Sequence, residues 1–127
     1  MDEANAPATE AAAAALGPED AKLIVLARAA RARTGATEGA AVRDSDGRTY
    51  VAVTVALPSL RLSALQAAVA AAVGSGAADL VAAAVVSCAE SPDGDGVSAV
   101  RDLSDSAVIF FAGTDGTLVS TDQASAT

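Results

Sequence analysis

Hydrophobic residues first recur at helical spacing in residues 18–33. Leucine and alanine side chains three or four positions apart would form one apolar stripe there, which predicts an amphipathic helix. Pro18 suits the first turn of this helix, and Thr34-Gly35 is a typical stop signal. The expected stripe consists of Leu23, Leu26, Ala27 and Ala30.

In residues 39–55 the hydrophobic residues recur at every second position instead. Two runs, 39–44 and 48–55, flank Ser45-Asp46-Gly47, and valine occupies every second position from Val51 to Val55. Alternation of this kind around a glycine-containing turn predicts a β-hairpin. The segment Asp44 to Gly47 also resembles the start of a calcium loop, but the remaining ligands and the distal Glu are missing, so the turn interpretation is preferred.

Residues 62–73 are mostly apolar and carry no charge. Pro58 separates this stretch from the hairpin, and Gly74-Ser75-Gly76 ends it. A helix without charge on any face is expected to be buried on more than one side. We therefore expect one side to pack on the sheet and the other on a second copy of the chain, in a dimer or tetramer.

The second half of the chain predicts two further strands and a short helix. Leu80 to Ser87 is an unalternated Leu/Val/Ala run, the pattern of a central strand covered on both faces. A short helix is expected at 97–103 and a strand at 107–112, and Asp115-Gly116 marks a turn into residues 117–120. This order of elements specifies an α/β sandwich with a mixed sheet.

Length and composition indicate one folded domain. The chain has 127 residues and 52% hydrophobic content, enough for a single moderate core. Residues 1–17 are rich in alanine and poor in bulky side chains, so we expect a disordered tail there. The folded domain is expected at 18–121, followed by a C-terminal tail at 122–127.

Charge and cysteine content narrow the class of partner. Sixteen carboxylates against eight Lys and Arg give a formal net charge of −8, which opposes binding to nucleic acid. The chain has no 18-residue apolar run free of charge, so we expect no membrane span. The single Cys88 excludes an internal disulfide, and the acidic N-terminus does not match a secretory signal, so a cytoplasmic location is expected.

Several of these segments are similar to motifs of the small, homotetrameric-type cytidine deaminases. The pair Gly39-Ala40-Ala41-Val42 and Asp46-Gly47-Arg48 resembles the hairpin of that family, and Val81 to Ser87 resembles one of its strands. The resemblance extends from about Asp20 to Ser120. It implies a three-layer sandwich with the order α-β-β-α-β-α-β and an optional last strand.

The resemblance also shows where the family's chemistry would lie. In that family the second helix opens with Cys-Ala-Glu, and a later helix carries Pro-Cys-x-x-Cys. The matching stretches here are Ser63-Ala64-Leu65 and Gly96 to Arg101, in which Ala64, Ala99 and Arg101 keep the pattern. By this match the metal positions are Ser63, Val97 and Val100, and the proton-shuttle position is Leu65.

None of these four side chains can perform the family's chemistry. Zinc in such enzymes activates a water molecule, and a Glu that is not a ligand moves protons. A neutral hydroxyl at Ser63 cannot replace a thiolate, and Leu65 cannot carry a proton. The family's ribose-binding Asn-x-Glu is matched by Thr54-Val55-Ala56. We therefore expect no catalytic residue, no metal and no other cofactor, with Thr54, Ala56, Ser63 and Leu65 as the candidate pocket.

Other candidate sites are weaker. Cys88 has no histidine anywhere in the chain to activate it. Residues 94–99 match a dinucleotide-binding fingerprint, but a proline-containing loop separates them from the preceding strand. A group of acidic residues could attract a cation, although such groups are usually solvated in an acidic protein. That group consists of Asp93, Asp95, Asp102 and Asp105.

Three hypotheses for function follow. The first is a non-catalytic, cytidine-deaminase-like pseudoenzyme that self-associates as a structural or regulatory module. The second is a small-ligand module that binds a nucleoside or another flat ring in the vestigial pocket. The third is an active cytidine deaminase, which would hydrolyse cytidine or deoxycytidine to uridine or deoxyuridine, against the residue chemistry described above.

Overall fold

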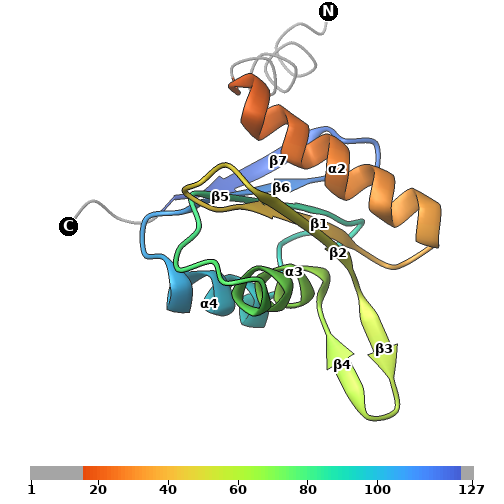
Figure 1. Ribbon diagram of the computed structural model, residues 1–127. Helices are drawn as coiled ribbons and strands as arrows, with labels where there is room; N and C mark the ends of the chain where they lie inside the picture. The colour runs from red at the N-terminus through yellow and green to blue at the C-terminus, as the bar shows by residue number, and fades with distance from the viewer. Residues whose placement is uncertain (1–15, 124–127) are drawn as a thin grey trace, which may run out of the picture.

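The computed structural model describes residues 16–123. A five-stranded sheet lies between helix α2 on one face and helices α3 and α4 on the other (Figure 1). The helices are α2 (Pro18–Thr34), α3 (Ala64–Gly74) and α4 (Gly94–Leu103). The strands are β1 (Gly39–Arg43), β2 (Thr49–Val53), β3 (Val55–Leu57), β4 (Leu60–Leu62), β5 (Ala82–Val86), β6 (Val108–Ala112) and β7 (Leu118–Asp122).

The sheet is mixed, and its strand order is β2-β1-β5-β6-β7. Strands β5 and β6 run parallel because α4 crosses over between them, whereas the other neighbours are antiparallel. All five residues of β5 are buried, as expected of a strand covered on both faces. The predicted α/β class and the central position of this strand are confirmed.

Helix α2 packs closely on its face of the sheet. It ends at Gly35, whose φ of 70° is the left-handed conformation that favours glycine. Its buried stripe includes Ile24, whereas the predicted Leu26 is only half-buried. A Cβ at Gly39 of β1 would collide with the carbonyl oxygen of Ala27, so this layer depends on direct contact between the two backbones.

Helices α3 and α4 cover the opposite face and enclose the larger core cluster. The side chains of Phe111, Ile109 and Val85 point from the sheet into this cluster. Leu65 and Val69 meet them from α3, and Val100 does so from α4. The packing against α2 uses the other side of the same strands, with Phe110 and Val86 among its residues.

A two-stranded arm between β2 and α3 was not predicted from the sequence. Strands β3 and β4 pair with each other and project from the body of the domain (Figure 1). Pro58, interpreted above as a break before the helix, lies in the turn of this arm. Leu57 and Leu60 flank the turn and are 54% and 48% exposed. Residue Val55, predicted to end the second strand of the hairpin, belongs to the arm instead.

The predicted domain boundaries can be compared with the structure only in part. Most of the tails expected at 1–17 and 122–127 lies outside the described residues. Leu16 packs against the core on the α2 side, and β7 includes Asp122, which pairs with Ile109. Within residues 16–123, no helix combines the length and apolar character needed to span a membrane.

Candidate functional site

The first turns of α3 and α4 meet in direct contact. A Cβ built at Gly96, in the first turn of α4, would lie 2.9 Å from Cβ of Leu65 and 3.0 Å from Oγ of Ser63. Real side chains essentially never approach so closely, so the junction has no room for even one extra methyl group. The structure thus brings the expected site positions on α3 next to the segment that carries the others on α4.

Ser63 caps helix α3. Its Oγ accepts a hydrogen bond of 3.1 Å from the backbone N–H of Gln66, and Oε1 of Gln66 accepts one of 2.9 Å from the backbone N–H of Ser63. This reciprocal pair is a capping box, which satisfies backbone donors that helix formation leaves free. The serine hydroxyl therefore has a structural role in starting the helix.

Hydrocarbon fills the rest of the junction. Leu65 is 1% exposed and Val100 is fully buried, and both belong to the same core cluster. Val97 is partly buried and packs against that cluster. The four positions predicted from the resemblance thus lie in one region of the molecule, and three of them contribute only carbon atoms to it.

A cavity of about 390 Å³ opens beside this junction, between the arm and the first turn of α4. Of the predicted pocket residues, Thr54, Ala56 and Ser63 line it, whereas Leu65 lies beneath and does not. Most of its polar wall was not predicted from the sequence. The additional polar residues of the wall are Glu38, Arg61, Gln66, Asp93 and Asp95.

Two of the polar groups beside the cavity are engaged with the backbone. Oγ1 of Thr54 accepts a hydrogen bond of 3.0 Å from the backbone N–H of Glu38. Asp93 caps α4, because its Oδ2 accepts a hydrogen bond of 2.8 Å from the backbone N–H of Gly96. A carboxylate thus occupies the helix end where the dinucleotide fingerprint would require a pyrophosphate.

A sequence comparison decides the family. The family model described as cytidine deaminase-like matches residues 16–116, which is most of the chain. The chain belongs to the cytidine deaminase-like family. Among curated proteins, a search with this sequence finds no match.

Solved structures of cytidine deaminases share the fold of this family member. The enzyme from Burkholderia pseudomallei superposes with a TM-score of 0.71 at 23% identity, over 80% of this chain and 90% of that one. The enzyme from Mycobacterium leprae gives 0.60 at 25% identity, over 71% and 85%. The enzyme from Mycobacterium tuberculosis gives 0.59 at 28% identity, over 71% and 80%. The predicted three-layer arrangement is therefore confirmed at the level of the fold.

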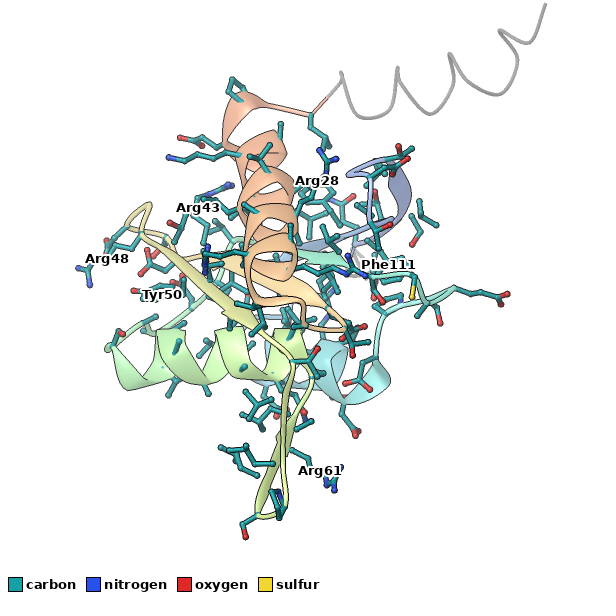
Figure 2. The ribbon with its side chains drawn as sticks, turned by 90° about the vertical axis from the view of Figure 1, so that its right-hand side faces the viewer. Arg28, Arg43, Arg48, Tyr50, Arg61 and Phe111 are labelled. Carbon is teal, nitrogen blue, oxygen red and sulfur yellow. The ribbon has the colours of Figure 1, made fainter. Side chains whose placement is uncertain are left out.

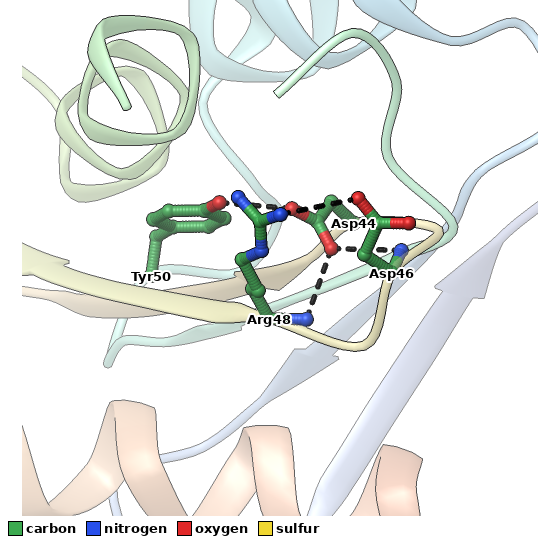
Figure 3. A network of polar contacts seen from close by, with 4 residues as sticks. All are labelled: Asp44, Asp46, Arg48 and Tyr50. Atoms are coloured by element: carbon green, nitrogen blue, oxygen red, sulfur yellow. Dashed lines mark hydrogen bonds and ion pairs between the residues drawn. The ribbon is translucent and has the colours of Figure 1, made fainter. Parts of the chain in front are cut away.

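A buried polar network of this cytidine deaminase-like domain lies elsewhere, in the β1–β2 turn (Figure 3). Asp44 is buried and accepts hydrogen bonds from the Tyr50 hydroxyl at 2.8 Å and from the backbone N–H groups of Asp46 and Arg48 at 3.0 and 2.9 Å. Its carboxylate thus holds the turn together. This arrangement agrees with the turn interpretation of residues 44–47 rather than with a calcium loop.

The same contacts shift two pKa values. Burial by itself raises the pKa of Asp44, but the hydrogen bonds from Tyr50, Arg48 and Asp46, with the Arg48 charge, lower it below the usual 3.8. The hydrogen bond to Asp44 raises the pKa of Tyr50 above the usual 10.0, and burial adds to this effect. Asp44 is therefore ionised and Tyr50 neutral at physiological pH.

The remaining candidates show no composite site. Cys88 is exposed in the loop after β5. Asp93 serves as a helix cap, and Asp95, Asp102 and Asp105 are exposed. In the part of the chain that the structure describes, no three His, Cys, Asp or Glu side chains are grouped so as to hold a metal ion.

Proposed function

We propose that this chain is a cytidine deaminase-like domain without zinc and without deaminase activity, which acts as a self-associating structural or regulatory module. The contact of Gly96 with Ser63 and Leu65 supports this proposal most strongly. A catalytic zinc site needs three protein ligands and an open position for water, and this junction is closed by packed atoms.

The chemistry of the side chains leads to the same conclusion. A thiolate or imidazole is needed to hold zinc, and a carboxylate is needed to move protons between the zinc-bound water and the base. Leu65 and Val100 provide only buried hydrocarbon, and the Ser63 hydroxyl is part of a capping box. A cation placed at this junction would have no ligand to compensate for its loss of water.

Metal content tests the proposal. The purified protein, dialysed against zinc-containing buffer and then against metal-free buffer, should retain well under one zinc per chain by elemental analysis. About one zinc per chain would contradict the proposal. Such a result would mean that side chains away from the α3–α4 junction complete a metal site.

A rebuilt site tests whether these positions correspond to the family's ligands. The variant Ser63→Cys/Val97→Cys/Val100→Cys should bind cobalt with a thiolate absorption band, because its three sulfurs would converge on one point. In the control variant, Ser98→Cys replaces Val100→Cys, so the thiolate count is equal but one sulfur is on the exposed side of α4. A folded rebuilt variant with no more absorption than this control would refute the correspondence.

Self-association is supported by the outer face of α3. The helix carries no charge, and Ala70, Ala71 and Val73 on that face are exposed in the single chain. Light scattering at micromolar concentration should give the mass of a dimer or tetramer. The variant Ala71→Glu should reduce this to the monomer mass while the chain stays folded, because the new charge would have to be buried at the interface. A wild-type monomer would exclude this part of the proposal.

The open cavity favours a second function, the binding of a small ligand. Its volume of about 390 Å³ lies in the range of small-molecule pockets, and Thr54 and Ala56 from the predicted pocket line it. A thermal-shift panel of nucleosides and free bases tests this function. A rise in the melting temperature that saturates with concentration is expected of a binder. No shift with any compound at millimolar concentration would exclude nucleosides and bases as ligands.

A further inference from the structure

We propose that the 390 Å³ cavity accepts a cationic ligand with a small flat apolar part and excludes anionic ligands, nucleotides included. This inference rests on the second proposed function, the binding of a small ligand, and gives that ligand a chemical class. It is independent of whether the domain deaminates cytidine. The charges and the apolar residues of its wall determine which ligands it favours.

The wall carries an excess of negative charge. Glu38, Asp93 and Asp95 contribute three formal negative charges, and Arg61 contributes one positive charge, which leaves −2. They come from three separate parts of the chain: the residue before β1, strand β4 of the arm and the N-terminal end of α4. The excess therefore arises where the fold brings these segments together around a cavity, in a chain whose net charge is already −8.

No ion pair within residues 16–123 neutralises these carboxylates, although Asp93 already accepts a backbone hydrogen bond as the cap of α4. The ion pairs in residues 16–123 join Arg43 to Asp20, Arg48 to Asp46, and Arg101 to Asp122, and none includes a carboxylate of the cavity. These carboxylates therefore remain free of side-chain ion pairs and can attract a cation in the cavity. Two unit charges about 4 Å apart attract by about 1 kcal/mol even in bulk water, and by more where water is partly excluded.

The cavity provides few groups for an anion. The end of α4, where backbone N–H groups could bind a phosphate, is already capped by Asp93 at 2.8 Å. Arg61 is the one cation in the wall, and it lies on the projecting arm (Figure 2), where its side chain is exposed. Arg61 is one positive charge against three carboxylates, of which Asp93 and Asp95 are also exposed, so the wall keeps a net negative charge.

Part of the cavity wall is apolar. Val55 and Leu62, a cross-strand pair of the arm, line it together with Ala56. A flat ring can bury its face against these residues while a cationic substituent remains near the carboxylates. A wall that contains both apolar and anionic groups favours a ligand with the same two parts.

Three compounds of nearly equal shape separate charge from ring stacking: benzamidine, benzamide and benzoate, with formal charges of +1, 0 and −1. Binding to the full chain would be followed by amide chemical shifts in two-dimensional NMR, which also locate the site. Benzamidine should bind roughly tenfold more tightly than benzamide, as expected for one or two nearby charges. Benzoate should not bind measurably, and the preference for benzamidine should shrink at high salt.

Matched variants assign the effect to the cavity. Asp95→Asn and Glu38→Gln should each weaken benzamidine binding roughly threefold, because each removes one charge from the wall. Asp102→Asn makes the same change about two turns further along α4, outside the cavity, and should leave the affinity within error of the wild type. Asp93 is left unchanged because it caps the helix.

Each outcome is decisive. Tighter binding of benzamidine with shifts around residues 54–66 and 93–96, weakened by Asp95→Asn but not by Asp102→Asn, supports the proposal. Equal binding of all three compounds at the cavity refutes the charge preference but keeps a ligand-binding function. Absence of binding for all three at millimolar concentration, or equal effects of Asp95→Asn and Asp102→Asn, overturns the proposal. A deaminase assay bears on none of these results and tests the proposed lack of catalysis separately.

Discussion

The β1–β2 turn and the α3–α4 junction differ in what they bury: the turn buries a charged group, and the junction buries apolar side chains. In the turn, the buried carboxylate of Asp44 has three hydrogen-bond donors, from Tyr50, Asp46 and Arg48 (Figure 3). At the junction, buried leucine and valine fill the space between two helix ends. The first region uses a charge to fix backbone geometry, whereas the second contains no ionisable group in its packed interior.

The domain thus keeps a buried charged group away from the junction. A buried carboxylate is costly without partners, and the turn keeps one because its hydrogen bonds hold the hairpin in register. The apolar junction lies where the resemblance to the family predicts metal ligands and a proton shuttle. The contrast between the two regions agrees with the proposed absence of the family's chemistry at the junction.

The largest effect is expected from a charge placed in the junction. Leu65→Glu should destabilise the fold by at least about 3 kcal/mol, because it buries a carboxylate with no donor in an apolar cluster. Gln66→Glu adds the same charge one residue later and should be neutral or stabilising, since glutamate suits this position of a capping box. Urea unfolding of both variants measures the difference. Similar stability of the two variants would show that the junction is hydrated or polar.

A smaller effect is expected from a single methyl group. Gly96→Ala should destabilise the domain by about 1 to 3 kcal/mol, because its Cβ would overlap Leu65 and Ser63. Gly94→Ala is the matched control in the same helix turn, since nothing lies within 4 Å of its Cβ position, and it should gain a few tenths of a kcal/mol or more. Thermal unfolding of the pair provides the test. Equal melting temperatures would mean that the junction is open rather than filled.

The stabilising contribution of the turn should be present at neutral pH and lost in acid. Because the native pKa of Asp44 is lowered, the unfolded chain takes up the proton first, so its contribution is complete well above pH 3.8 and is lost as the pH falls through the native pKa. Asp44→Asn should lower the melting temperature by several degrees at pH 7 and show a shallower decline below pH 5. Asp46→Asn, with an exposed side chain in the same turn, is the control. Parallel pH curves for wild type and Asp44→Asn would exclude this role.

Much of the fold could be predicted because it depends on local patterns. The turn at Asp46-Gly47 has φ of 86° at the glycine, and the unalternated run of β5 is buried on both faces. The β3–β4 arm escaped prediction because its strands have three residues each, and a proline between them has the same pattern as a simple break.

The candidate site could be predicted only in part, because it depends on contacts between distant segments. The family resemblance located Ser63 and Val100, but nothing in the sequence marks Gly96 as the residue whose missing side chain allows the two helix ends to touch. The sequence also gives no sign that Tyr50 donates a hydrogen bond. Its bond to Asp44, six residues earlier, becomes evident when the hairpin register is known.

The most direct test of the central claim is an activity assay with zinc supplied. Purified protein at micromolar concentration, with equimolar zinc and millimolar cytidine or deoxycytidine, would be incubated for hours and analysed for uridine or deoxyuridine by chromatography. We predict no product above the protein-free background. Product formed in proportion to protein concentration and abolished by a zinc chelator would contradict this prediction, and would show that the domain deaminates cytidine despite its apolar junction.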